Sequence, residues 1–183
     1  MKYASTVKAL IALLGCLICI TAQGQTDIIV QISANGEIIT TGEGGTPIAG
    51  VDTADYAFAL SYGWTGEIRL DANSGLPTGR TRYAPLRFVK PLARSSILLR
   101  KALSQEEDVE VTLRLFADDG KGSSQEIYRI DLINGRVSGI RPFSDGGSGQ
   151  FLEEIQISWQ AIEFTDVLTD TSHVIQFPTL PAN

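Results

Sequence analysis

GRTRYAPLRFVKPLARSSILLRKAL, residues 79–103, reads as a β-strand, a proline-marked corner and one short helix. We expect the strand over residues 83–90, ended by Pro91 because proline removes a backbone donor from the sheet. The helix is expected at about residues 95–105. No later segment returns to helical periodicity, so the sequence predicts a mainly β domain with one short α-helix on its flank.

The predicted helix combines a polar start with an apolar stripe. Ser95 or Ser96 is expected to cap it, since a serine hydroxyl accepts hydrogen bonds from the free N–H groups of the first turn. Side chains four residues apart share one side of a helix. The apolar residues spaced in this way, which we expect to form one buried stripe, are Leu98, Leu99, Ala102 and Leu103.

The other structured segments follow the two-residue period of β-strands. Strands are expected over residues 27–33, 37–40, 55–64, 66–70, 109–115, 126–133, 152–164 and 172–177. Along 55–64 large side chains face one way, and the small ones, from Ala57 to Gly63, face the other. The small face suits a close partner, which is either a second layer of the fold or a neighbouring subunit.

The Asn134-Gly135 pair has two interpretations. Both residues tolerate a positive φ, which favours a tight hairpin between two strands. The alternative is one long strand that bends at this point and runs on to Ile140.

Length and composition indicate a single domain. The chain has 183 residues, 43% hydrophobic and 20% charged, with a net charge of −6. An acidic chain lacks the basic face typical of nucleic-acid binders, so we expect no nucleic-acid partner. An acidic average still allows a local basic patch, and the basic residues that gather in the sequence are Arg80, Arg82, Arg87, Lys90 and Arg94. A solvated strand and helix start explains them better than a site for a polyanion.

Residues 1–24 have the pattern of a secretory signal peptide. Two lysines precede an apolar run at residues 9–20, and Ala22 or Gly24 offers a cleavage site. The run is shorter than the about 20 apolar residues that span a bilayer, so we expect no stable membrane insertion after cleavage. The chain therefore divides into a signal peptide (1–24), a β domain (25–177) and a loose C-terminal tail (178–183).

Both cysteines, Cys16 and Cys19, fall within the signal peptide. The mature domain then has no thiol or disulfide chemistry. Leu-Leu-Gly-Cys, which ends at Cys16, is close to a lipobox, but the chain stays apolar beyond it, which disfavours lipidation.

The sequence predicts no catalytic, cofactor or metal site. His173 is the single histidine, and a zinc site needs further cysteine or histidine ligands. No Gly-x-Ser-x-Gly motif accompanies it as in many serine hydrolases. The acidic positions Glu110 and Glu153-Glu154 suggest a glycosidase pair, but solubility and protection of strand edges explain them better.

Four segments, in order along the chain, resemble the haemolysin-coregulated protein (Hcp) family, the inner-tube proteins of bacterial type VI secretion systems. They are Leu60-Ser61-Tyr62-Gly63-Trp64, residues 78–103, YRIDLINGRVSGI at residues 128–140, and LEEIQISW at residues 152–159 with the Ile162-Glu163-Phe164 that follows. Ala161 departs from the family pattern, in which lysine is common, and Phe164 stands where tryptophan is common.

The resemblance implies an antiparallel β-barrel of two packed sheets with a helix at one side. It also favours the bent strand at Asn134-Gly135. It implies a non-enzymatic protein without cofactors that forms homohexameric rings, stacks them into a tube and carries small effectors, with a spike protein and a sheath as further partners. The candidate ring-stacking loop comprises Thr41, Gly42, Glu43, Gly44, Gly45, Thr46 and Pro47. The candidate subunit-contact helix presents Ser96, Leu98, Leu99 and Leu103.

The signal peptide departs from the family, whose members are normally made without one. Three hypotheses follow. The chain is an exported, periplasmic or extracellular ring-forming protein, or a monomeric secreted β-barrel binding module that has lost tube function. In the third, translation starts near Gln25 and the protein is a cytoplasmic tube subunit before secretion.

Overall fold

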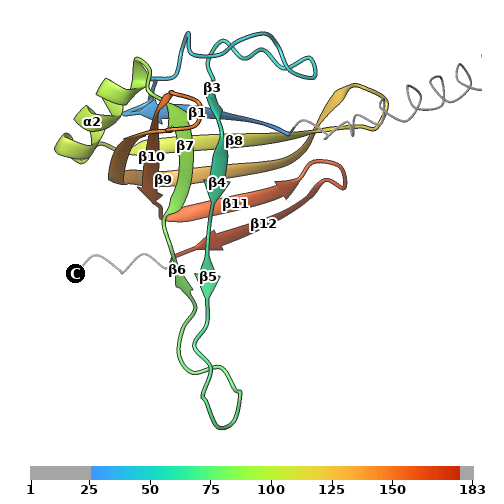
Figure 1. Cartoon of the computed structure of the whole chain (residues 1–183). Helices are drawn as coiled ribbons and strands as arrows, with labels where there is room; N and C mark the ends of the chain where they lie inside the picture. The colour runs from blue at the N-terminus through green and yellow to red at the C-terminus, as the bar shows by residue number, and fades with distance from the viewer. Residues whose placement is uncertain (1–25, 178–183) are drawn as a thin grey trace, which may run out of the picture.

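The computed structural model describes residues 26–177 and confirms a mainly β, antiparallel fold with one short helix (Figure 1). The predicted signal peptide, its two cysteines and the C-terminal tail lie outside these residues. The strands are β1 Asp27–Ala34, β2 Glu37–Ile38, β3 Ala57–Ala59, β4 Ser61–Gly63, β5 Gly66–Glu67, β6 Arg82–Tyr83, β7 Leu86–Pro91, β8 Val109–Asp118, β9 Ser124–Ser144, β10 Phe151–Ser158, β11 Ala161–Asp166 and β12 Thr171–Gln176. The helix, α2 Ser95–Gln105, has the predicted span.

The strands form a barrel in the order β1-β8-β9-β10-β7, with every pair antiparallel. The segment β3–β4 closes it, because β3 pairs with β1 and β4 pairs with β7. The single strand predicted over residues 55–64 is therefore wrong, since the chain changes partner at Leu60. The small residues Ala57 and Ala59 are buried in the core. Of the two close partners considered for the small face of this segment, they therefore pack against the second layer of the fold.

β9 crosses from one sheet to the other in a single bent strand. Its first part pairs with β8 and β11, and its second part pairs with β10. Asn134 adopts the left-handed conformation at the bend, with φ 51°. The interpretation of Asn134-Gly135 as a bend is thus confirmed, and the hairpin is excluded.

The β10–β11 segment, which lies beside β9, turns at the same corner. Residues 152–164, predicted as one strand, form β10 and β11 with Trp159 and Gln160 between them. The Gln160 N–H donates to the Asn134 carbonyl at 3.3 Å, and Asn134 Nδ2 donates to Gln160 Oε1 at 3.0 Å. These bonds hold the two segments together where both leave one sheet and enter the other.

The interior of the barrel is filled by branched and aromatic side chains from both sheets. Burying each of them is worth about 1.5–3 kcal/mol. The largest fully buried apolar side chains of this core are Ile32, Leu86, Phe88, Leu99, Leu113, Ile130, Leu132, Ile155 and Ile157.

The buried side of α2 differs in part from the predicted stripe. Leu99 and Ala102 are buried as expected, but Leu103 is 38% exposed and Ser95 lies inside. The strand expected over residues 83–90 is also divided, because β6 leaves the barrel and only β7 belongs to it. Pro91 is the last residue of β7, where its missing N–H removes no bond from the barrel interior.

Within residues 26–177, no helix combines the length and hydrophobicity required to cross a membrane.

Gly135 is required by the close packing of the corner. A Cβ at this position would lie 2.5 Å from Leu132 Cδ2, 2.8 Å from the Val109 carbonyl oxygen and 2.9 Å from Ile157 Cγ2. Gly135→Ala is therefore expected to lower the free energy of unfolding by about 1–3 kcal/mol, as overpacking does. Urea denaturation measures the change. Gly146→Ala, which meets nothing within 4 Å, is the matched control, and equal stability of the two variants would contradict the packing at this corner.

Candidate functional site

A buried ion cluster joins the two segments that the sequence singles out for subunit contacts. Lys90 of β7 is fully buried, and its Nζ lies 3.3 Å from Glu153 Oε1 and 3.6 Å from Glu43 Oε2. Lys90 and Glu153 stand opposite each other in the β7–β10 pair. Burying an ammonium group without a nearby carboxylate costs several kcal/mol of folding free energy. The two carboxylates therefore offset the cost of burying Lys90.

The start of α2 completes the cluster. Ser95 donates from both its N–H and its Oγ to Glu43, the latter at 2.8 Å, and Ser96 Oγ donates to Glu153 Oε1 at 2.6 Å. Arg100 Nη1 lies 3.2 Å from Glu153 Oε2. Two cations thus balance two carboxylates, and both carboxylates lie at the helix N-terminus, where the helix dipole favours negative charge.

The predicted serine cap is wrong in its details. The N-cap residue is Arg94, whose side chain makes no capping hydrogen bond, and both serines lie in the first helical turn. Glu43, 52 positions earlier in the chain, accepts the Ser95 N–H instead. The interpretation of Glu153 as a surface acid for solubility is likewise wrong, because it is fully buried.

The loop of residues 41–47 is held against the barrel through this cluster. The Glu43 side chain is only 8% exposed. A Cβ on Gly44 would lie 1.7 Å from the Thr53 carbonyl oxygen, so the backbone passes too close for any other residue. Thr46 and Pro47 are exposed. The loop therefore has a fixed base and an accessible outer end.

Only part of the predicted contact side of α2 is accessible. Ser96 and Leu99 are buried within the chain, whereas Leu98 is half-buried and Leu103 is exposed. Ile97, which the sequence analysis did not select, is 69% exposed.

A hairpin formed by β5 and β6 projects from the barrel (Figure 1). We call residues 65–83 the arm. The Thr78 N–H donates to the Arg69 carbonyl at 2.7 Å, and Leu70 forms a β-bridge with Pro77. The sequence analysis expected a loop over residues 71–78 and missed that its flanks pair with each other.

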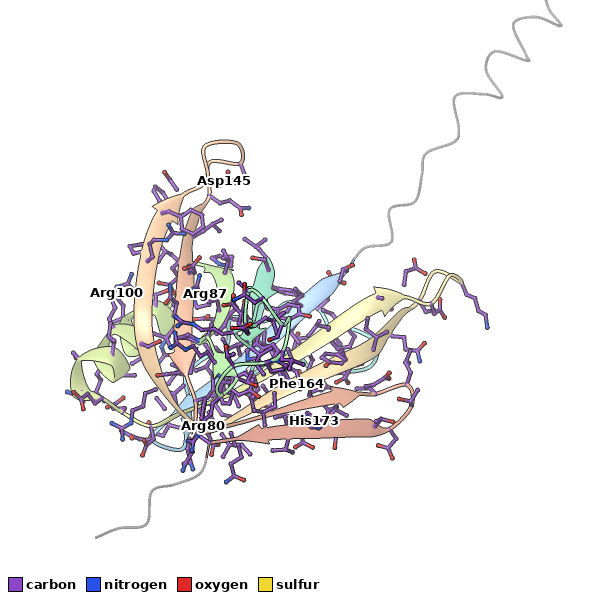
Figure 2. The ribbon with its side chains drawn as sticks, turned by 90° about the horizontal axis from the view of Figure 1, so that it is seen from below. Arg80, Arg87, Arg100, Asp145, Phe164 and His173 are labelled. Carbon is purple, nitrogen blue, oxygen red and sulfur yellow. The ribbon has the colours of Figure 1, made fainter. Side chains whose placement is uncertain are left out.

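The structure separates the basic residues that cluster in the sequence. Lys90 is buried in the ion cluster, Arg80 and Arg82 lie on the arm, and Arg87 is exposed on β7 (Figure 2). The interpretation as solvated positions is confirmed for the four arginines, which are exposed, and is wrong for Lys90. His173 is exposed on β12, and the residues described contain no group of three or more histidine, cysteine or acidic side chains able to hold a metal ion.

Comparisons with known proteins agree with this architecture. A family model described as "Type VI secretion system effector, Hcp" matches residues 49–165. A crystal structure of an Hcp protein is similar with a TM-score of 0.74 at 19% identity, covering 82% of this chain and 99% of that one. A mutant of Hcp1 from E. coli EAEC 042 gives 0.69 at 19%, covering 82% and 97%. The secreted protein Hcp3 from Pseudomonas aeruginosa gives 0.64 at 17%, covering 85% and 100%. No curated protein sequence matches the chain.

Glu153→Gln tests the buried cluster. It leaves Lys90 and Arg100 with one carboxylate, and removing one partner of a buried pair typically costs about 3–5 kcal/mol. Glu154→Gln is the matched control, because Glu154 is the next residue and pairs at 3.3 Å with the exposed Arg141, a pair worth about 0–1 kcal/mol. Urea denaturation of both variants compares them. Equal losses of stability would contradict the role assigned to the cluster.

A second ion cluster predicts a pH dependence of stability. Burial opposes the charged form of Glu126, but Arg114 and then Arg129 outweigh it and hold the pKa of this carboxyl below its ordinary value. Its stabilisation is therefore present above the unfolded pKa of about 4.3 and is lost as the pH falls through the lower folded pKa. The stability difference between wild type and Glu126→Gln should shrink on acidification. A difference that stays constant would contradict the depressed pKa, and Glu110→Gln, an exposed change on β8, is the control.

Proposed function

Because the chain belongs to the Hcp family of type VI secretion effectors, we propose that it is a structural, non-enzymatic tube subunit that forms homohexameric, stacked rings. One observation carries this proposal. The family match spans residues 49–165, which include the arm, α2 and the corner of the barrel. The similarity in fold to Hcp structures supports it over more than four-fifths of the chain.

The proposed rings carry small effectors, with a spike protein and a sheath as further partners. Three surfaces suit contacts between subunits. The outer end of the loop at residues 41–47 and the exposed side of α2 with Ile97 and Leu103 remain candidates from the sequence. The arm is a third candidate, because it projects from the barrel and carries exposed apolar side chains.

Export outside the cytoplasm is the second part of the proposal. It rests on the signal-peptide pattern of residues 1–24. An alternative start near Gln25 would instead give a cytoplasmic subunit that leaves the cell only by secretion.

The alternative function is that of a monomeric secreted β-barrel that binds a ligand. An open apolar groove in a single copy of the chain favours it, and its lining includes Tyr62, Trp64, Tyr128 and Phe164. This alternative requires no contact between subunits.

Native mass spectrometry distinguishes the two functions. At concentrations in the range of tens of micromolar, where specific protein interfaces of ordinary affinity are occupied, we expect six subunits and multiples of six. A monomer throughout this range would exclude the tube proposal and favour the binding module.

N-terminal sequencing of the protein from cell fractions tests the export proposal. We expect a mature chain that begins at Gln23 or Gln25, directly after Ala22 or Gly24, in the periplasmic or extracellular fraction. An unprocessed cytoplasmic chain that begins near Gln25 would support the alternative start instead.

A further inference from the structure

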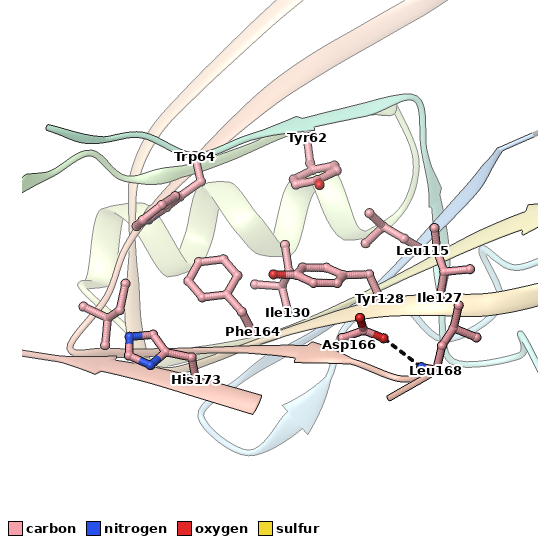
Figure 3. Close-up of a pocket in the computed structure, with 11 residues that line it drawn as sticks. Tyr62, Trp64, Leu115, Ile127, Tyr128, Ile130, Phe164, Asp166, Leu168 and His173 are labelled. Atoms are coloured by element: carbon pink, nitrogen blue, oxygen red, sulfur yellow. Dashed lines mark hydrogen bonds between the residues drawn. The ribbon is translucent and has the colours of Figure 1, made fainter. Parts of the chain in front are cut away.

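An open apolar groove lies between β4 and the sheet of β9, β11 and β12 (Figure 3). Its volume is about 790 Å³, within the range of about 300–1,000 Å³ that is typical of small-molecule sites. Figure 3 shows Tyr62 and Trp64 on one side of it, with Tyr128 and Phe164 facing them from the other. Branched aliphatic side chains complete the apolar part of the lining, among them Ile127, Ile130 and Ile175.

The aromatic rings of the groove keep their faces available. The Trp64 and Phe164 ring centroids are 5.0 Å apart at an interplanar angle of 64°, and those of Tyr128 and Phe164 are 6.4 Å apart at 37°. Neither pair stacks face to face, so these contacts do not use up the ring faces. Tyr62, on the opposite side, is 40% exposed. The face of an aromatic ring carries negative electrostatic potential and attracts cations.

The one carboxylate of the groove adds negative charge to the same space. Asp166 is the single acidic residue in the lining, and none of the lining residues is a lysine or an arginine. Asp166 Oδ1 accepts the N–H groups of Leu168 at 2.9 Å and Thr169 at 3.1 Å. These bonds hold the carboxylate in place and leave Oδ2 for a ligand.

Asp166 lies close enough to the tyrosines to act on them. Burial raises the pKa of the Tyr128 phenol, and the neighbouring Tyr62 and Asp166 raise it further, because they disfavour another negative charge beside them. An environment that disfavours an anion favours a cation. Charge and aromatic surface in the groove therefore select for the same kind of ligand.

This chemistry distinguishes between classes of ligand. An anion would meet a carboxylate and no lysine or arginine. A metal cation such as Ca²⁺ or Mg²⁺ needs about six or more oxygen ligands, and one carboxylate is a poor start for such a set. A quaternary ammonium ion is recognised instead by aromatic faces, and an apolar tail attached to it would cover the aliphatic part of the lining.

We propose that the groove is a binding site for a small organic cation, an alkylated quaternary ammonium ion, with its charged group among Tyr62, Tyr128 and Asp166. The alkyl tail packs against the remaining apolar lining. This inference goes beyond the proposed tube function, and it gives a ligand class to the alternative function of a binding module.

Isothermal titration calorimetry of the purified full chain tests the preference for a cation. The probes are hexyltrimethylammonium and hexyl sulfate, which share one tail and differ in the sign of the charge. The titration is carried out at pH 8, where histidine side chains are neutral, and in about 0.15 M salt, which screens long-range charge effects. We expect the cation to bind at least about tenfold more tightly than the anion.

Two pairs of variants assign the preference to this groove. Asp166→Asn should weaken binding of the cation several-fold, whereas Asp170→Asn, the same change at an exposed position of the β11–β12 turn, should not. Asparagine keeps an acceptor for the Leu168 and Thr169 N–H groups. Tyr62→Leu removes an aromatic face but keeps an apolar side chain, so it should also weaken the cation several-fold. Tyr62→Phe keeps the face and is the matched control.

Native mass spectrometry of the same samples separates this inference from the proposed function. Rings of six subunits that show no preference for the cation overturn the inference and leave the tube proposal standing. A monomer that prefers the cation, and loses the preference in Asp166→Asn, supports the inference and excludes the tube. Equal affinities of Asp166→Asn and Asp170→Asn for the cation overturn the inference in any state of assembly.

Discussion

The buried ammonium group of Lys90 is the constraint on which the arrangement of the other elements depends. A lysine inside a barrel requires carboxylates, and Glu153 and Glu43 provide them from β10 and from a loop that is distant in sequence. The same carboxylates bind Ser95 and Ser96 at the start of α2. One cluster thus fixes the position of the helix and of the loop at residues 41–47 on the barrel. Glu43 is the side chain that joins this loop directly to the helix.

The second constraint is the corner at which the chain passes between the sheets. β9 bends at Asn134-Gly135, and the adjacent β10–β11 segment is interrupted at Trp159 and Gln160. Hydrogen bonds between Asn134 and Gln160 keep the two bends together. The corner separates the molecule into two sides, with Arg100 and the ion cluster on one and Phe164 and His173 of the groove on the other (Figure 2).

Sequence periodicity predicted the element types well and their ends less well. The helix at residues 95–105 and the alternation of β8 were found because each has an uninterrupted apolar pattern. The breaks at Leu60 and at Trp159 were missed, because a strand that changes partner keeps its two-residue period. Lys90 and Glu153 carry a usable signal, since each continues the inward phase of apolar neighbours such as Phe88 and Ile155. The groove carries no such signal, because strands distant in sequence assemble it.

The family assignment leads to one central claim, the proposal that copies of this chain assemble into stacked rings. A cryo-electron microscopy reconstruction of the purified full chain tests it most directly. The account predicts sixfold rings that are stacked on one another. Single particles of one subunit would contradict it.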